Sequence, residues 1–176
     1  MKPALAIAVL LAAAGSARAD EGDGALGFRI AFGQLPIGGE RPLAVSLAVG
    51  SEHELAGKLR GFGEYEWMWL EQDRLTTGSG SRVQLGVRHV LADHVVPKLM
   101  RLYVDGELGG GSALLSDPTG VHVVPDGFAG VRFGYDVIPH DARSPANTLQ
   151  FELSARALYL PHGAGWMAGV GVWWGD

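Results

Sequence analysis

The stretch that most constrains the fold is Leu149–Tyr159, which alternates apolar and polar side chains with a period of two residues. One face carries Leu149, Phe151, Leu153, Ala155, Ala157 and Tyr159, and the other carries Gln150, Glu152, Ser154 and Arg156. This period predicts a β-strand with one apolar and one polar face. A soluble sheet alternates in the same way as a membrane sheet, so only the rest of the chain can show which kind of sheet this strand belongs to.

Seven further stretches repeat the alternation. The predicted strands are 26–33, 42–51, 61–70, 81–91, 99–109, 127–137, 149–159 and 165–174. The segments between them, such as SDPTG and HDARSPAN, are rich in turn-forming residues. Short, evenly spaced strands joined by turns predict an all-β antiparallel meander, and eight of them predict an up-and-down barrel.

The first 19 residues have the pattern of a cleaved export signal. Lys2 is positive, residues 4–14 form an apolar run too short to span a bilayer as a helix, and Ala-Arg-Ala at 17–19 precedes Asp20. The chain has no Cys, which excludes a lipoprotein anchor. We expect a signal peptide over 1–19 and one barrel domain over 20–176. An exported chain of this kind is periplasmic, secreted or an outer-membrane barrel.

Charge narrows the function classes. The expected mature chain loses Lys2 and Arg18 from the 14 basic residues and keeps all 19 acidic residues, so its formal net charge is −7. A basic footprint for nucleic acid is therefore absent. No glycine motif for a nucleotide and no closely spaced metal-binding pair of His residues is present, so we expect no cofactor and no metal site.

The polar face of the predicted strands is unusual because it carries six Arg, six carboxylates and no Lys. These residues are Arg29, Glu64, Glu66, Arg82, Arg88, Arg101, Asp105, Glu107, Arg132, Asp136, Glu152 and Arg156. A planar guanidinium can pair bidentately with a carboxylate, and buried charges are tolerated only when paired. The pattern predicts a packed ionic interior and an apolar, lipid-facing outer wall. A soluble barrel with the faces inverted is the alternative.

Large aromatic residues lie near the ends of the apolar faces. Trp166 and Trp174 are eight residues apart on one strand, which is about 20 Å along the membrane normal and close to the roughly 25 Å lipid band of such barrels. We expect Trp69 and Tyr159 in an outer interfacial girdle, and Tyr135 and Trp174 in a periplasmic one.

Two stretches, GFAGVRFGYDV at 127–137 and GAGWMAGVGVWWG at 163–175, resemble strands of the small eight-stranded outer-membrane barrels of the OmpA-domain, OmpX and OmpW kind. The resemblance implies a transmembrane β-barrel in the outer membrane of a Gram-negative cell envelope, reached by export through the inner membrane. It implies outer-membrane lipid, lipopolysaccharide and the outer-membrane assembly machinery as partners, and a monomeric chain. With the N-terminus periplasmic, segments 33–41, 70–80, 109–126 and 160–165 would be extracellular loops.

The function expected from these features is a structural or surface-interaction role without catalysis. One alternative is a lipid A-modifying acyl hydrolase or transferase, in which His122 with Ser112, Ser116 and Asp117 of the 109–126 segment would form a triad. Another alternative is a porin-like narrow channel for small solutes through the charged interior.

Overall fold

The computed structural model describes residues 24–37, 41–72, 76–96, 100–117, 120–137 and 148–175. They form eight strands: β1 Gly24–Gln34, β2 Leu43–Ala56, β3 Leu59–Gln72, β4 Thr76–Val96, β5 Met100–Asp117, β6 Gly120–Val137, β7 Thr148–Leu160 and β8 Gly163–Gly175. All eight predicted strands are confirmed, and most are longer than predicted. The predicted signal peptide at 1–19 lies outside the described residues.

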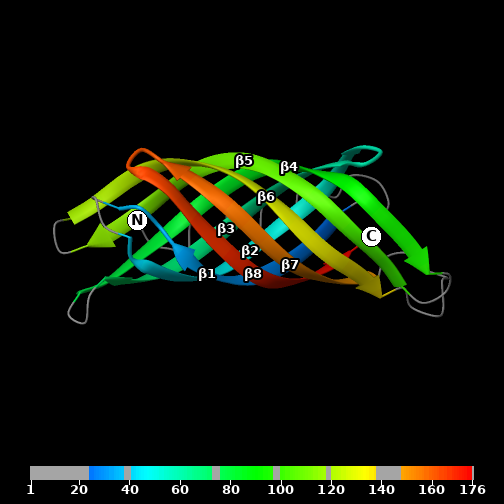
Figure 1. The fold of residues 1–176 in the computed structure, drawn as a ribbon, viewed down its shortest axis with the longest axis horizontal. Coiled ribbons are helices and arrows are strands. Elements are labelled where there is room, and N and C mark those ends of the chain that lie inside the picture. The colour runs from blue at the N-terminus through cyan, green and yellow to red at the C-terminus, as the bar shows by residue number, and fades with distance from the viewer. Residues whose placement is uncertain are drawn as a thin grey trace.

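The strands form a closed antiparallel barrel in sequence order, with β1 paired to β8 (Figure 1). A circuit of paired residues that leaves β8 at Trp174 and crosses every strand returns to β8 at Ala164, ten residues away. For eight strands, this displacement corresponds to a tilt of about 40° from the barrel axis. Within the described part of the chain, no helix is long and apolar enough to cross a membrane.

The barrel has two distinct ends. Gly24 and Gly175 lie at one end, called here the terminal end, together with the tight β2–β3 turn at Gly57 and Lys58. The opposite end, called the distal end, carries the β7–β8 turn, visible as the orange-red hairpin at the left of Figure 1.

The distal end differs from the expected loops. Segment 109–126 was predicted to be the longest loop, but residues 109–117 continue β5 and residues 120–126 belong to β6. These extensions pair with each other up to Asp117 and Gly120. Similarly, β3 and β4 occupy most of segment 70–80. The backbone hydrogen bonds of the hairpins therefore extend the sheet beyond the predicted strand ends.

The two faces of the wall have opposite chemistry. Ile30, Leu85 and Val170 point outward and are 58%, 68% and 55% exposed, whereas inward-pointing Arg29 and Arg132 are almost completely buried. The barrel therefore encloses its charges and presents its apolar residues outside, which is the reverse of a soluble barrel.

Candidate functional site

The centre of the interior is organised around Glu64, on β3. Its carboxylate accepts hydrogen bonds from Arg29 at 2.8 Å, from Arg88 at 2.9 Å, and from both terminal nitrogens of Arg156 at 2.6 and 3.1 Å. These three arginines come from β1, β4 and β7, so the contacts cross the barrel. Arg156 also donates to Glu107 through Nε, at 2.5 Å. A carboxylate with several guanidinium donors remains ionised and compensated when buried.

A second cluster lies closer to the terminal end. Arg132 donates to Asp105 through Nε and Nη2, at 2.9 and 2.5 Å, and through Nη1 to Glu52 and Glu152, at 3.2 and 3.1 Å. Glu52 also accepts from Arg88, at 2.5 Å. Because Arg88 contacts Glu64 as well, the two clusters form one connected network.

A third cluster lies toward the distal end, around Arg82. Its Nε donates to Glu66 at 2.7 Å and its Nη1 to Asp126 at 3.1 Å. Ser46 donates to the other oxygen of Glu66 at 2.5 Å, and Gln84 donates to Asp126 at 3.2 Å. Ser46 thus satisfies the Glu66 oxygen that Arg82 leaves open, whereas Gln84 shares Asp126 Oδ2 with Arg82, and Asp126 Oδ1 has no hydrogen-bond partner among the described residues.

Eleven of the twelve residues predicted for the interior are buried, and Arg101 is the exception. The Arg101 side chain is 28% exposed and pairs with Asp93 at 3.3 Å. Two buried carboxylates, Glu52 and Asp126, had been assigned to loops. Extending the alternation of strand 42–51 by one residue would have placed Glu52 inside, and extending strand 127–137 backward would have done the same for Asp126.

The predicted equality of buried charges is therefore wrong. Among the residues that the structure describes, five arginines and eight carboxylates have little or no exposure. The acidic excess is offset at the terminal end by partly exposed Arg60, which donates to Glu52 at 2.8 Å. Arg101 is the other partly exposed arginine at this end. The interior thus draws part of its positive charge from its rim.

Two aromatic rings pack against the guanidinium groups of Arg88 and Arg156. Phe62 and Phe128 lie 5.9 Å apart between their centroids. The Arg88 guanidinium carbon lies 4.0 Å from the Phe62 centroid, and that of Arg156 lies 4.7 Å from the Phe128 centroid. Stacking on ring faces stabilises a guanidinium that also pairs with carboxylates. The rings fill space that would otherwise admit water between the charges.

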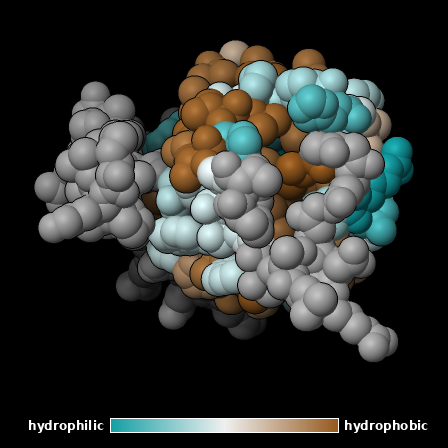
Figure 2. Space-filling view, turned by 90° about the vertical axis from the view of Figure 1, so that its left-hand side faces the viewer, coloured by the Kyte–Doolittle hydropathy of each residue, from teal (hydrophilic) through white to brown (hydrophobic). Residues whose placement is uncertain are grey.

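An apolar cluster fills the distal third of the interior. It consists mainly of Leu35, Ala44, Met68, Leu70, Ala113, Leu115, Leu158 and Met167, with Ile37, Val124 and Leu160 packed against it. These side chains come from β2, β3, β5, β7 and β8 and from the segment after β1, with Val124 added by β6, so they meet across the lumen. We call this cluster the distal plug. Figure 2 looks onto this end of the barrel, where hydrophobic residues (brown) occupy much of the visible surface.

A small polar cavity lies at the terminal end of the ionic network. Its volume is about 10 Å³, and it is lined by Arg60, Val90, Arg101, Tyr103, Asp105 and Asp136. Tyr103 Oη, Asp105 Oδ1 and Asp136 Oδ1 are buried and have no hydrogen-bond partner among the described residues. A polar cavity of this size matches a single water molecule.

The residues considered for catalysis lie where β5 and β6 extend at the distal end of the barrel, within residues 109–117 and 120–126. Ser112 and Ser116 point outward, in register with Pro125 and Val121. His122 pairs with buried Leu115 and so belongs to the opposite face of the ribbon. The structure therefore does not bring either serine onto the face of His122. Asp117 ends β5, and its side chain lies outside the described set. No cluster of metal-binding residues occurs in the described ranges.

The register places the five interfacial aromatic residues at two levels. Trp69, Tyr159 and Trp166 lie within about 4 Å of one another along the barrel axis, and Tyr135 and Trp174 lie together near the terminal end. The two levels are about 20–24 Å apart, which matches the apolar band of outer-membrane barrels, roughly 25 Å tall. All five side chains face outward and are 37–58% exposed.

Comparison with solved structures finds the same architecture. Neisserial surface protein A matches with a TM-score of 0.60 and 12% identity, over 87% of this chain and 97% of that one. The chain has the fold of the small eight-stranded outer-membrane β-barrels. Ail of Yersinia pestis in complex with the heparin analogue sucrose octasulfate matches with a TM-score of 0.49 and 15% identity, over 89% of this chain and 100% of that one.

The N-terminal barrel of Pseudomonas aeruginosa OprF matches with a TM-score of 0.47 and 12% identity, over 89% of this chain and 100% of that one. No protein-family model and no curated protein matches the sequence. The match to Neisserial surface protein A supports the eight-stranded outer-membrane barrel fold, and none of these comparisons carries an activity to this chain.

Proposed function

We propose that this protein resides in the outer membrane as a closed barrel with a structural or surface-interaction role, without transport or catalysis. The observation that carries the proposal is the filled interior. An eight-stranded barrel is just wide enough for its own side chains. Here the ionic network and the distal plug occupy successive levels of that space.

The filled interior argues against the narrow channel. A solute entering from the distal end would meet Leu35, Met68 and Leu115, each 2% exposed or less. Beyond them it would have to separate arginines from carboxylates that they contact at 2.5–3.3 Å. Separating buried ion pairs costs several kcal/mol each. We therefore infer that the barrel does not conduct at rest.

The extensions of β5 and β6 at the distal end, residues 109–117 and 120–126, support a surface role. We call this two-stranded extension the distal ribbon. The register places Val121 about 10 Å further from the terminal end than Trp69, beyond the outer aromatic level. Val121 and Val123 are each 69% exposed and Leu114 is 49% exposed. Apolar side chains outside the lipid band commonly mark an interaction surface. We infer that the ribbon projects from the cell, where it contacts lipopolysaccharide or a protein partner.

The remaining parts of the proposal concern how the chain reaches the membrane. The signal-like residues 1–19 would direct export through the inner membrane, and the assembly machinery would then insert the barrel. Because the wall has no unpaired sheet edge, a single chain can satisfy its backbone hydrogen bonds in lipid. We propose that the inserted protein is a monomer surrounded by outer-membrane lipid.

Cysteine labelling tests the location, because the native chain has no Cys. Val121→Cys should react with a membrane-impermeant maleimide on intact cells, whereas Lys58→Cys, at the terminal end, should react only after the cells are broken. Both residues are exposed, so accessibility alone does not distinguish them. Absence of Val121→Cys labelling on intact cells, or equal labelling of both, would contradict the proposed location and orientation.

Planar-bilayer recording tests the closed interior. The folded wild-type barrel should show no reproducible conductance, and steady single-channel steps would refute a filled lumen. Mass spectrometry of lipid A from cells with and without the protein tests the absence of acyl-chain chemistry. A defined change in acyl composition that required His122 would favour the enzyme alternative.

A further inference from the structure

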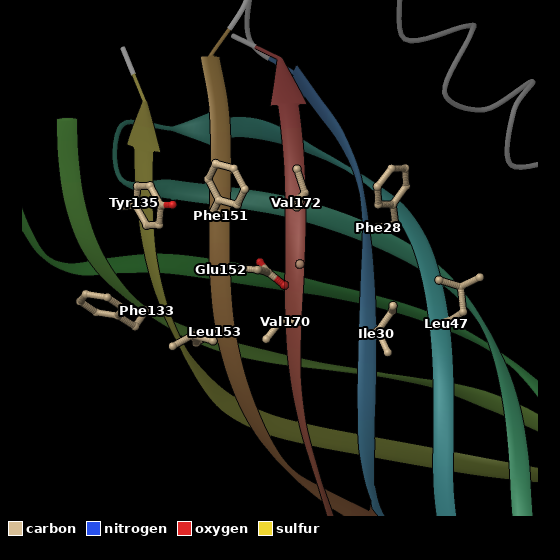
Figure 3. Close-up of a pocket in the computed structure, with 11 residues that line it drawn as sticks. Phe28, Ile30, Leu47, Phe133, Tyr135, Phe151, Glu152, Leu153, Val170 and Val172 are labelled. Atoms are coloured by element: carbon tan, nitrogen blue, oxygen red, sulfur yellow. The ribbon is translucent and has the colours of Figure 1, made fainter. Parts of the chain in front are cut away.

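A groove crosses the outer wall of the barrel where β1, β7 and β8 lie side by side (Figure 3). Val170 and Val172 of β8 lie in its middle. Phe28 and Ile30 of β1 line one side, and aromatic and aliphatic residues of β6 and β7 line the other. The complete lining is Phe28, Ile30, Leu47, Phe133, Tyr135, Phe151, Glu152, Leu153, Val170, Gly171 and Val172. The volume is about 580 Å³.

Aromatic contacts hold the rims of this wall groove in place. Phe28 packs edge-to-face on Trp174, with centroids 5.3 Å apart, and Tyr135 stacks on Phe151 with centroids 5.0 Å apart and an interplanar angle of 16°. Such ring pairs restrict side-chain rotation. The groove is therefore built from mutually supported side chains and is not a chance gap between mobile ones.

The wall groove begins at the terminal aromatic level and extends through more than half of the lipid band. By the strand register, its lining extends from the level of Tyr135, near the terminal end, to Leu47, about 17 Å further along the axis. The aromatic level at the terminal end thus marks the opening of the groove toward the interface. In the orientation proposed above, this opening faces the periplasmic interface.

The lining also indicates the kind of ligand. Its one charged residue, Glu152, is buried, and its Oε2 accepts a hydrogen bond from Arg132 Nη1 inside the barrel, at 3.1 Å. The described lining contains no Lys, Arg or His that could bind a phosphate. The wall groove can therefore recognise a hydrocarbon chain, and its described lining has no cationic group to select a phosphate head group.

We propose that the wall groove binds one acyl chain of a phospholipid from the periplasmic leaflet. The inference rests on the proposed outer-membrane location, because the groove is continuous with the wall that lipid covers. A flexible acyl chain can follow a concave, apolar surface of this size. A second copy of the chain fits less well, because two-fold symmetry would set two concave grooves face to face and leave a void.

Two tryptophan variants provide the test. Val170 lines the groove and is 55% exposed, whereas Val131 lies outside the lining and is 53% exposed. Val170→Trp should fill the groove, and Val131→Trp adds the same side chain elsewhere on the lipid-facing wall. Each protein is inserted into liposomes containing a phospholipid with a photoactivatable diazirine in its acyl chain. Cross-linked peptides are then mapped by mass spectrometry.

We expect cross-links to concentrate on β1, β7 and β8 in the wild type. Val170→Trp should reduce them roughly tenfold, because even one added methylene changes binding in a hydrophobic pocket by about 10- to 200-fold, and Val131→Trp should leave them unchanged. Cross-links spread evenly around the barrel, equal effects of the two variants, or cross-links between two copies at the groove would overturn the proposal.

The same preparation tests the membrane location and the wall groove separately. Folded, inserted barrels are first identified by their heat-dependent mobility on a gel and by protection of the wall from added protease. Failure to insert would refute the membrane location and the wall groove together. Correct insertion with evenly distributed cross-links would refute the wall groove alone.

Discussion

Replacing Arg132 with Leu should be among the most destabilising single changes in the barrel. The Arg132 side chain is fully buried and contacts Asp105, Glu52 and Glu152. Glu52 would keep Arg60 and Arg88 as partners. Asp105 and Glu152 have no other ion-pair partner among the described residues.

The magnitude follows from those two carboxylates. Removing one partner of a buried ion pair costs about 3–5 kcal/mol, because it leaves an uncompensated charge. Arg132→Leu leaves two such charges, so we expect a loss at the upper end of that range, about 5 kcal/mol. The total stability of a folded domain is about 5–15 kcal/mol, so the loss is a large fraction of it.

The assay is urea unfolding in liposomes, followed by tryptophan fluorescence and by the heat-dependent gel mobility of the folded barrel. Arg41→Leu is the matched control, since Arg41 is exposed between β1 and β2. A surface change of this kind should stay within about 0.5 kcal/mol. Equal unfolding midpoints for the two variants would refute the paired ionic interior.

A triple variant distinguishes stranded charge from lost packing. If the cost of Arg132→Leu comes from unpaired carboxylates, then adding Asp105→Leu and Glu152→Leu should restore much of the lost stability, because a buried ion cluster can be replaced by apolar residues with little net cost. A triple variant less stable than Arg132→Leu alone would show that the charges themselves are not the cause.

Two further predictions concern the wall. Gly134→Ala would place a Cβ against the Tyr103 ring and should cost about 1–3 kcal/mol in urea unfolding. Gly127→Ala on the same strand meets nothing closer than 3.8 Å and should have little effect; equal losses would contradict this packing. Leu85→Arg, at mid-height on the outer wall, should cost about 2–4 kcal/mol in a bilayer, whereas Ser79→Arg, beyond the outer aromatic level, should cost about 0–1 kcal/mol. Similar penalties at both sites would show that this wall does not face hydrocarbon.

The strands and the closed barrel could be predicted because alternation survives wherever the two faces differ. It fails at the distal end, where Leu114 points outward and Leu115 inward, so both faces are apolar. The glycines at 109–111 further hide the period. Strand pairing across the hairpin overrides these weak local preferences, which is why a loop was predicted where β5 and β6 continue.

The residue types of the interior could be predicted, but the pairs could not. Arg156 contacts Glu64, which is 92 residues away in sequence. That contact depends on the ten-residue displacement of the barrel and on side-chain length, neither of which a strand pattern specifies. The distal plug was missed for a related reason: its residues meet only after the sheet has closed.

The two strands that close the barrel, β1 and β8, contribute only one charged side chain to the interior. The inward face of β8 carries Met167, Gly169, Gly171 and Trp173, and the single inward-facing charge of β1 is Arg29. The ion pairs described above otherwise join residues of β2 to β7. The ionic network can therefore assemble on a curved six-stranded sheet before the ends meet.

The β1–β8 seam joins without any ion pair between its described residues, so backbone hydrogen bonds and the Phe28–Trp174 and Phe32–Trp166 contacts hold it shut. It is the seam at which the barrel can open or close while the ion pairs among β2 to β7 stay intact.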